Sequence, residues 1–119
     1  MPHLDYTMLD ELKEIMDDEF LALLRAFLSD SDTRVKSLRV AYDAGDHDNA
    51  RAIAHSFKGS SGNMGAAALS QLCTEIEQLA KDGRTLDAGT LIGELEGEYK
   101  SVATEIMGVI SSDAKLPKK

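Results

Sequence analysis

The segment Ala50–Glu77 reads ARAIAHSFKGSSGNMGAAALSQLCTEIE, and it contains two helical patterns separated by a glycine-rich break. At about 100° per residue, Ile53 and Phe57 fall on one apolar stripe of the first pattern. His55 lies about 200° from both of them, so its imidazole is predicted to face solvent. The face that carries His55 also carries Arg51, Ala52, Lys58, Gly59 and Gly62.

On either side of this segment, glycines separate stretches in which apolar residues recur at spacings of three and four. This pattern predicts helices joined by short turns. A long helix is expected to begin after the acids at 17–19 and to end at Gly45, which can adopt a positive φ. Asp46 is the predicted N-cap of the helix that carries His55. Linkers this short make neighbouring helices antiparallel.

Capping signals predict the remaining boundaries. Thr7 and Asp10 have the spacing of a capping box, which would open a short first helix. Gly83 is expected to end the helix that carries Glu77. Thr85 or Asp87 is expected to begin the last helix.

No segment alternates with a period of two, and each long helix has an apolar stripe and a charged back. These patterns predict an all-α protein, an antiparallel four-helix bundle with a short additional N-terminal helix. We expect the bundle to comprise residues 1–112 and the polar residues 113–119 to form a disordered tail.

Composition restricts the class of partner. The 119 residues include 13 Lys and Arg against 21 Asp and Glu, a formal net charge of −8, so nucleic acid and anionic membrane are poor partners. A single cysteine allows no internal disulfide, and no apolar run is long enough to span a membrane. We expect a cytoplasmic monomer with no metal or other cofactor of its own.

His55 has neighbours that suit chemistry with an anion. Lys58 at i+3 is close enough to contact an anion held on the ring. Gly59 costs a helix about 0.5 to 1 kcal/mol relative to alanine, which we interpret as clearance for a partner's surface. If the flanking helices are antiparallel, Glu77 returns to the level of His55, where its carboxylate can accept the Nδ1 proton and leave Nε2 exposed. A solvated helix acid fits the same spacing equally well.

Other chemistries have less support in the sequence. His47 and His55 are about 12 Å apart along a helix, too far to share a metal ion, and no Glu-x-x-His pair occurs. Cys73 falls inside an apolar stripe, as a small core residue does. Ser60 and Ser61 lack the second histidine and the acid of a catalytic triad.

Several residues match the signature of histidine-containing phosphotransfer (HPt) domains, and the chain resembles a free-standing bacterial member of that family. The matching residues are Ala54-His55-Ser56-Phe57-Lys58-Gly59, Gly65-Ala66, Leu69, Cys73 and Glu77. The resemblance implies a four-helix bundle that relays a phosphoryl group between the receiver-domain aspartates of a hybrid sensor kinase and a response regulator. It also implies that the receiver supplies Mg²⁺ and that the chain has no autonomous kinase activity.

By the same resemblance, His55 is the phosphoacceptor and Lys58 steadies the phosphoryl oxygens. Glu77 would hold Nδ1, although some members have Gln at this position. The candidates for the docking surface are Arg51, Ala52, Gly59 and Gly62, with Met8, Leu12 and Met16 as further apolar contacts. The alternative function is a non-phosphorylated helical docking module that binds or sequesters a receiver domain.

Overall fold

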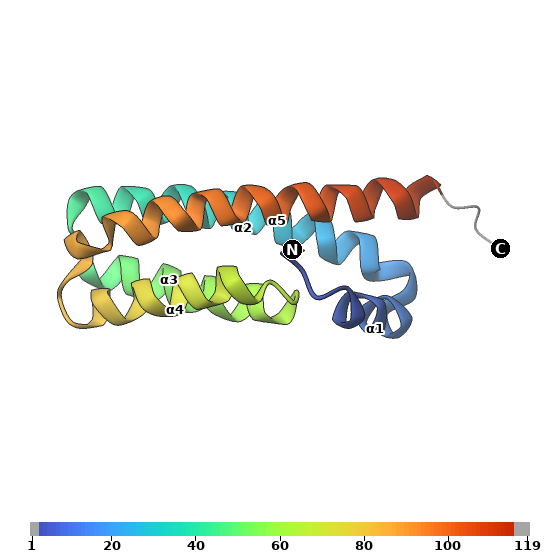
Figure 1. Ribbon diagram of the computed structural model, residues 1–119, viewed down its shortest axis with the longest axis horizontal. Helices are drawn as coiled ribbons and strands as arrows, with labels where there is room; N and C mark the ends of the chain where they lie inside the picture. Colours follow the sequence, from blue (N-terminus) through green and yellow to red (C-terminus); the bar gives the residue numbers. More distant parts are fainter. Residues whose placement is uncertain (1–2, 116–119) are drawn as a thin grey trace.

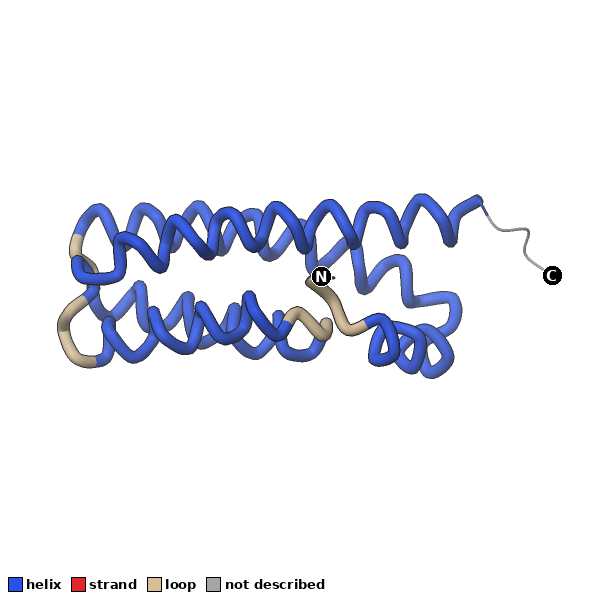
Figure 2. Tube along the Cα trace, in the orientation of Figure 1, coloured by secondary structure: helices blue, strands red, loops and turns tan. Residues whose placement is uncertain are grey.

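The computed structural model describes residues 3–115, and the side chains of residues 3–112. Figure 2 shows helices and turns, and no strand, in this part of the chain. The elements in chain order are α1 (Tyr6–Met16), the 3-10 turn η1 (Asp17–Glu19), α2 (Phe20–Ala44), α3 (His47–Asn63), α4 (Ala67–Lys81), the 3-10 turn η2 (Thr85–Ala88) and α5 (Gly89–Lys115).

Helices α2 to α5 form an antiparallel bundle, as predicted. Figure 1 shows α2 and α5 along one side of the bundle and α3 and α4 along the other. Helix α1 lies beyond the end of the α3–α4 pair, against the parts of α2 and α5 that extend past it. The all-α class and the extra N-terminal helix are therefore confirmed.

The turn between α2 and α3 sets where α3 begins and thus which face each of its residues occupies. Gly45 ends α2 with a φ of 62°, a conformation in which glycine has no steric cost. The side chain of Asp46 accepts a hydrogen bond from the backbone N–H of Asn49 at 3.1 Å. Both predicted caps are confirmed. Because only these two residues join α2 to α3, the linker fixes the residue at which α3 begins.

The predicted capping box at Thr7 is wrong. Helix α1 begins two residues earlier than that box implies, and its N-cap is Asp5, whose carboxylate accepts the backbone N–H of Met8 at 3.1 Å. The backbone N–H of Asp5 also donates to the carbonyl of Gly65 at 2.9 Å. This second bond joins the start of α1 to the turn between α3 and α4, a tertiary contact that local spacing does not indicate.

The predicted start of α5 at Thr85 or Asp87 is also wrong, because both residues belong to the turn η2. Thr85 does not act as a helix cap, because it is buried and its hydroxyl is hydrogen-bonded to Nδ1 of His47 at 2.7 Å. The α-helix begins at Gly89, where an added Cβ would lie 2.6 Å from the hydroxyl of Tyr42. A larger residue at this position would require the side chain of Tyr42 to shift.

At its other end, α5 continues to Lys115, past the boundary expected at residue 112. The part of the predicted tail at 116–119 lies outside the described residues.

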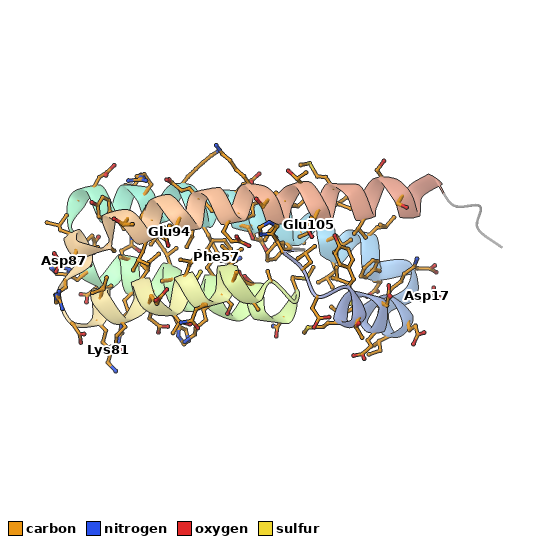
Figure 3. The ribbon with its side chains drawn as sticks, viewed as in Figure 1. Asp17, Phe57, Lys81, Asp87, Glu94 and Glu105 are labelled. Atoms are coloured by element: carbon orange, nitrogen blue, oxygen red, sulfur yellow. The ribbon has the colours of Figure 1, made fainter. Side chains whose placement is uncertain are left out.

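The bundle core is apolar and includes the inner face of α3. Phe57 lies between the two helical layers in Figure 3 and is completely buried. Its ring meets that of Tyr99 edge-on, with centroids 6.1 Å apart. Because Phe57 is anchored in this way, the opposite face of α3 must point to solvent.

Two buried serines, Ser31 and Ser61, have hydroxyls with no hydrogen-bond partner among the described residues. We expect Ser31→Ala to raise the free energy of unfolding by about 1 to 2 kcal/mol, because it removes an unsatisfied hydroxyl and adds a better helix former. Urea unfolding measures this change. The exposed Ser29→Ala on the same helix is the control and should show only the helix-propensity gain of about 0.5 kcal/mol. Equal gains in both variants would contradict the prediction.

Candidate functional site

Helix α3 presents His55 to solvent because its neighbours on the other face are buried. Ala54 and Phe57 have no exposed surface, whereas the side chain of His55 is 68% exposed. The prediction that this imidazole faces solvent is confirmed. A ring placed this way can be reached by a large partner.

Glu77 reaches the same level of the bundle from α4. Its Oε2 lies 2.8 Å from Nδ1 of His55, so the contact anticipated from antiparallel packing is confirmed. An ionised carboxylate only accepts, so Nδ1 carries the proton and the lone pair lies on Nε2. Nε2 has no hydrogen-bond partner in the described part of the chain. The alternative interpretation of Glu77, as a solvated acid, is wrong.

The second oxygen of Glu77 is bound to Lys58. The Nζ of Lys58 donates to Oε1 at 2.8 Å, so one carboxylate binds both the lysine and the histidine. The side chain of Lys58 is 34% exposed, half the exposed fraction of His55. Of these two bonds, the sequence predicted only the one to His55. The ammonium charge of Lys58 is thereby balanced within the protein.

These two bonds keep Glu77 ionised. The hydrogen bond from Lys58 lowers the pKa of this carboxyl below its usual range, and the bond from His55 lowers it further, against an opposing effect of burial. An ionised carboxylate is a strong acceptor for the imidazole N–H. The tautomer with a free Nε2 is therefore favoured at neutral pH.

A further residue of the site, Ser70, was missed by the sequence analysis. Its hydroxyl donates to the backbone carbonyl of Lys58 at 3.0 Å, which ties α4 to α3 one turn beyond the histidine. Ser70 precedes Glu77 by seven residues, which is two helical turns, so both lie on the edge of α4 that faces α3. That spacing is the sequence signal by which Ser70 could have been found.

The predicted docking residues lie on the open face of α3. Arg51, Ala52, Gly59 and Gly62 are all exposed. A Cβ added at Gly59 would meet nothing within 4 Å, so the packing of this chain does not require glycine there. A Cβ at Gly62 would lie in ordinary contact with Ser70, at 3.6 Å.

The apolar residues suggested on α1 contribute less to the surface than expected. Met8, Leu12 and Met16 are half-buried, and the last two pack against the core. Ile15, which the sequence analysis did not single out, is 80% exposed. It is the large apolar side chain that α1 offers most fully to solvent.

The remaining candidate groups do not form a second reactive centre. Cys73 is fully buried, and burial raises its pKa to about 12, so it remains a thiol. His47 is bound to Thr85. Among the residues with described side chains, no three His, Cys, Asp or Glu residues could hold a metal ion. None of the described helices combines the length and apolarity needed to cross a membrane.

The site is thus an exposed histidine on an antiparallel four-helix bundle, bound through Nδ1 to an acid that also binds a lysine. The family model for the Hpt domain matches residues 22–105, and the chain therefore belongs to the Hpt domain family.

Two solved structures are similar to this chain over more than nine-tenths of its length. One is histidine-containing phosphotransfer protein B (HptB) from Pseudomonas aeruginosa PAO1, at 41% identity and a TM-score of 0.89, over 93% of this chain and 96% of that one. The other is the HPT domain of a sensor hybrid histidine kinase from Shewanella, at 22% identity and a TM-score of 0.80, over 92% and 95%. The second likeness concerns the fold alone. A search of curated proteins finds no match.

The lowered pKa of Glu77 predicts a pH-dependent contribution to stability. A carboxyl whose folded pKa lies below its unfolded pKa stabilises the protein above the unfolded value, and this contribution is lost as the pH falls through the folded pKa. We expect Glu77→Gln to lower the melting temperature at pH 7, and the difference from wild type to shrink between about pH 5 and pH 3. Thermal unfolding of the variant and of wild type at pH 7 and at pH 3 measures this difference. The exposed Glu75→Gln on the same helix is the control, and an undiminished difference for Glu77→Gln at pH 3 would contradict the prediction.

Proposed function

We propose that this protein relays a phosphoryl group between aspartates of two receiver domains, one in a hybrid sensor kinase and one in a response regulator. The observation that carries the proposal is the orientation of His55, whose Nδ1 is held by Glu77 at 2.8 Å while the ring remains 68% exposed. The likeness to HptB over nearly the whole chain supports the same function. Nε2 of His55 is the proposed phosphoacceptor.

The transfer step follows from this geometry. The Nε2 lone pair attacks the phosphorus of an aspartyl phosphate, and the bond between phosphorus and the aspartyl oxygen breaks, returning its electron pair to the carboxylate. The Nδ1 proton remains on the ring, and the adjacent carboxylate of Glu77 stabilises the positive charge that the imidazole gains. Transfer to the second receiver is the reverse of this step.

Phosphoryl transfer has a loose, in-line transition state, so positioning and neutralisation of charge account for most of the catalysis. Glu77 positions the ring, and Lys58 has two N–H groups beyond the one bound to Glu77 with which to steady the phosphoryl oxygens. We assign the Mg²⁺ that neutralises those oxygens to the receiver, because the described residues offer no cluster of metal ligands. The chain itself is proposed to be a carrier without autonomous kinase activity.

We also propose that the receiver docks on the open face of α3. Arg51, Ala52, Gly59 and Gly62 surround His55 on this face, and the clearance at Gly59 allows a partner to approach the helix backbone closely. The exposed Ile15 of α1 is an apolar candidate for the edge of this surface.

Incubation with a receiver domain carrying labelled phosphate, in the presence of Mg²⁺, tests the relay. We expect label to move to this protein and to be acid-labile and alkali-stable, as phosphohistidine is. A receiver that binds without losing its label, across the receivers of the same cell, would instead favour the non-phosphorylated docking module.

A further inference from the structure

The pair formed by Lys58 and Glu77 leaves no surplus positive charge beside His55. The ammonium of Lys58 is paired at 2.8 Å with the carboxylate of Glu77, which the same contact keeps ionised. A phosphoryl group on His55 would bring a further charge of about −1.5 to −2. This inference rests on the proposed function. If His55 carries a phosphoryl group, another cation beside Nε2 is needed to balance the added negative charge.

Arg51 is placed to supply that cation. It precedes His55 by four residues on α3, so the two Cβ atoms are about 5 to 6 Å apart on the same face. Side chains of a helix lean toward its N-terminus, so the imidazole of His55 covers the turn that contains Arg51, while Lys58 lies on the other side. Arg51 is exposed and has no ion pair or hydrogen bond to the part of the chain that the structure describes.

Two other charged groups lie near this turn. Asp48, three residues before Arg51, is exposed and makes no ion pair with it. Lys81 follows Glu77 by four residues on α4 and so lies one turn further along the same edge of that helix, and Figure 3 shows its side chain projecting away from the bundle. Arg51 shares a helix and a face with the phosphoacceptor, and its planar guanidinium can bind two oxygens at once.

We propose that Arg51 binds the phosphoryl oxygens of phosphorylated His55 through its guanidinium group. The arginine is thus a phosphate-binding residue, in addition to being part of the docking face. Glu77 remains the residue that orients the ring, and Lys58 remains a further donor to the phosphoryl oxygens.

Phosphoramidate offers a test that needs no receiver domain. It phosphorylates histidine directly: a bond forms between phosphorus and Nε2, the bond between phosphorus and its amide nitrogen breaks, and ammonia leaves. The phosphorus NMR signal of phosphorylated His55 is identified by its absence from His55→Gln. Titration of this signal then gives the pH at which the phosphoryl group gains its proton, and a bound cation lowers that midpoint.

We expect Arg51→Gln to raise the titration midpoint by about 0.5 pH unit, as loss of one charge at this distance in a solvated site predicts. Arg51→Lys should restore part of the shift. Arg25→Gln, which removes the same charge from an exposed position on α2, is the matched control and should leave the midpoint unchanged.

A midpoint in Arg51→Gln equal to that of Arg25→Gln would overturn the proposal, as would a rise seen in Lys81→Gln but not in Arg51→Gln. The relay is tested separately, because phosphoramidate labelling does not involve a receiver. A clear Arg51 effect together with no transfer from any receiver would leave the phosphate contact standing and reject the relay. Wild-type protein in which phosphoramidate does not label His55 would overturn the phosphate contact, and transfer from a receiver would still decide the relay.

Discussion

His55→Gln is expected to reduce phosphoryl uptake from a phosphorylated receiver to background, a loss of at least about 1000-fold. Glutamine keeps the size and polarity of the side chain but has no lone pair able to attack phosphorus. Because the side chain is 68% exposed, the free energy of unfolding should change by no more than about 0.5 kcal/mol. Transfer of label and urea unfolding, measured on the same preparation, check the two parts of this prediction.

His47→Gln is the matched control for this loss. His47 lies on the same helix, two turns earlier, and its ring is bound to Thr85. It should retain uptake close to the wild-type rate. Label retained in His55→Gln, or lost in His47→Gln, would reject His55 as the phosphoacceptor.

Gly59→Glu is expected to slow transfer from a receiver by at least about 100-fold while leaving the fold intact. The new side chain has room, because nothing lies within 4 Å of the added Cβ, and glutamate is a better helix former than glycine by about 0.5 kcal/mol or more. Its bulk and negative charge would nevertheless occupy the space into which a partner must fit. Transfer kinetics and circular dichroism measure the two effects.

The control for this variant is Gly97→Glu. Gly97 is also an exposed helical glycine with open space around it, but it lies on α5. Gly97→Glu should transfer at the wild-type rate. Gly59→Glu should in addition keep its phosphoramidate labelling, which separates blocked docking from a damaged histidine. Equal transfer rates in the two glutamate variants would show that Gly59 does not provide clearance.

Most features that the sequence predicted correctly depend on local structure, and the exception is the contact between His55 and Glu77, which also required antiparallel helices. The caps at Gly45 and Asp46 define the start of α3, and 3.6-residue periodicity from that point places Phe57 in the core and His55 in solvent. The conformation or face of each of these residues is set by residues within one or two helical turns of it. Patterns of this range are visible in a single sequence.

The predictions that were wrong concern residues whose partners are distant in the sequence. Thr85 was expected to cap a helix, but its hydroxyl is bound to His47 across the bundle end. The N-cap of α1 is Asp5, which is also bound through its backbone to Gly65. In both places a tertiary hydrogen bond competes with a local one, and spacing along the chain does not show which will form.

The sequence by itself determined that His55 stands on the outer face of a helix, because that outcome depends only on periodicity and on the apolar residues opposite. Only the tertiary structure decided that Glu77 binds His55 and Lys58 at once, each at 2.8 Å. That arrangement requires α3 and α4 to pack in one particular register. The register is a property of the assembled core, which buries Phe57 and the inner face of α4 together.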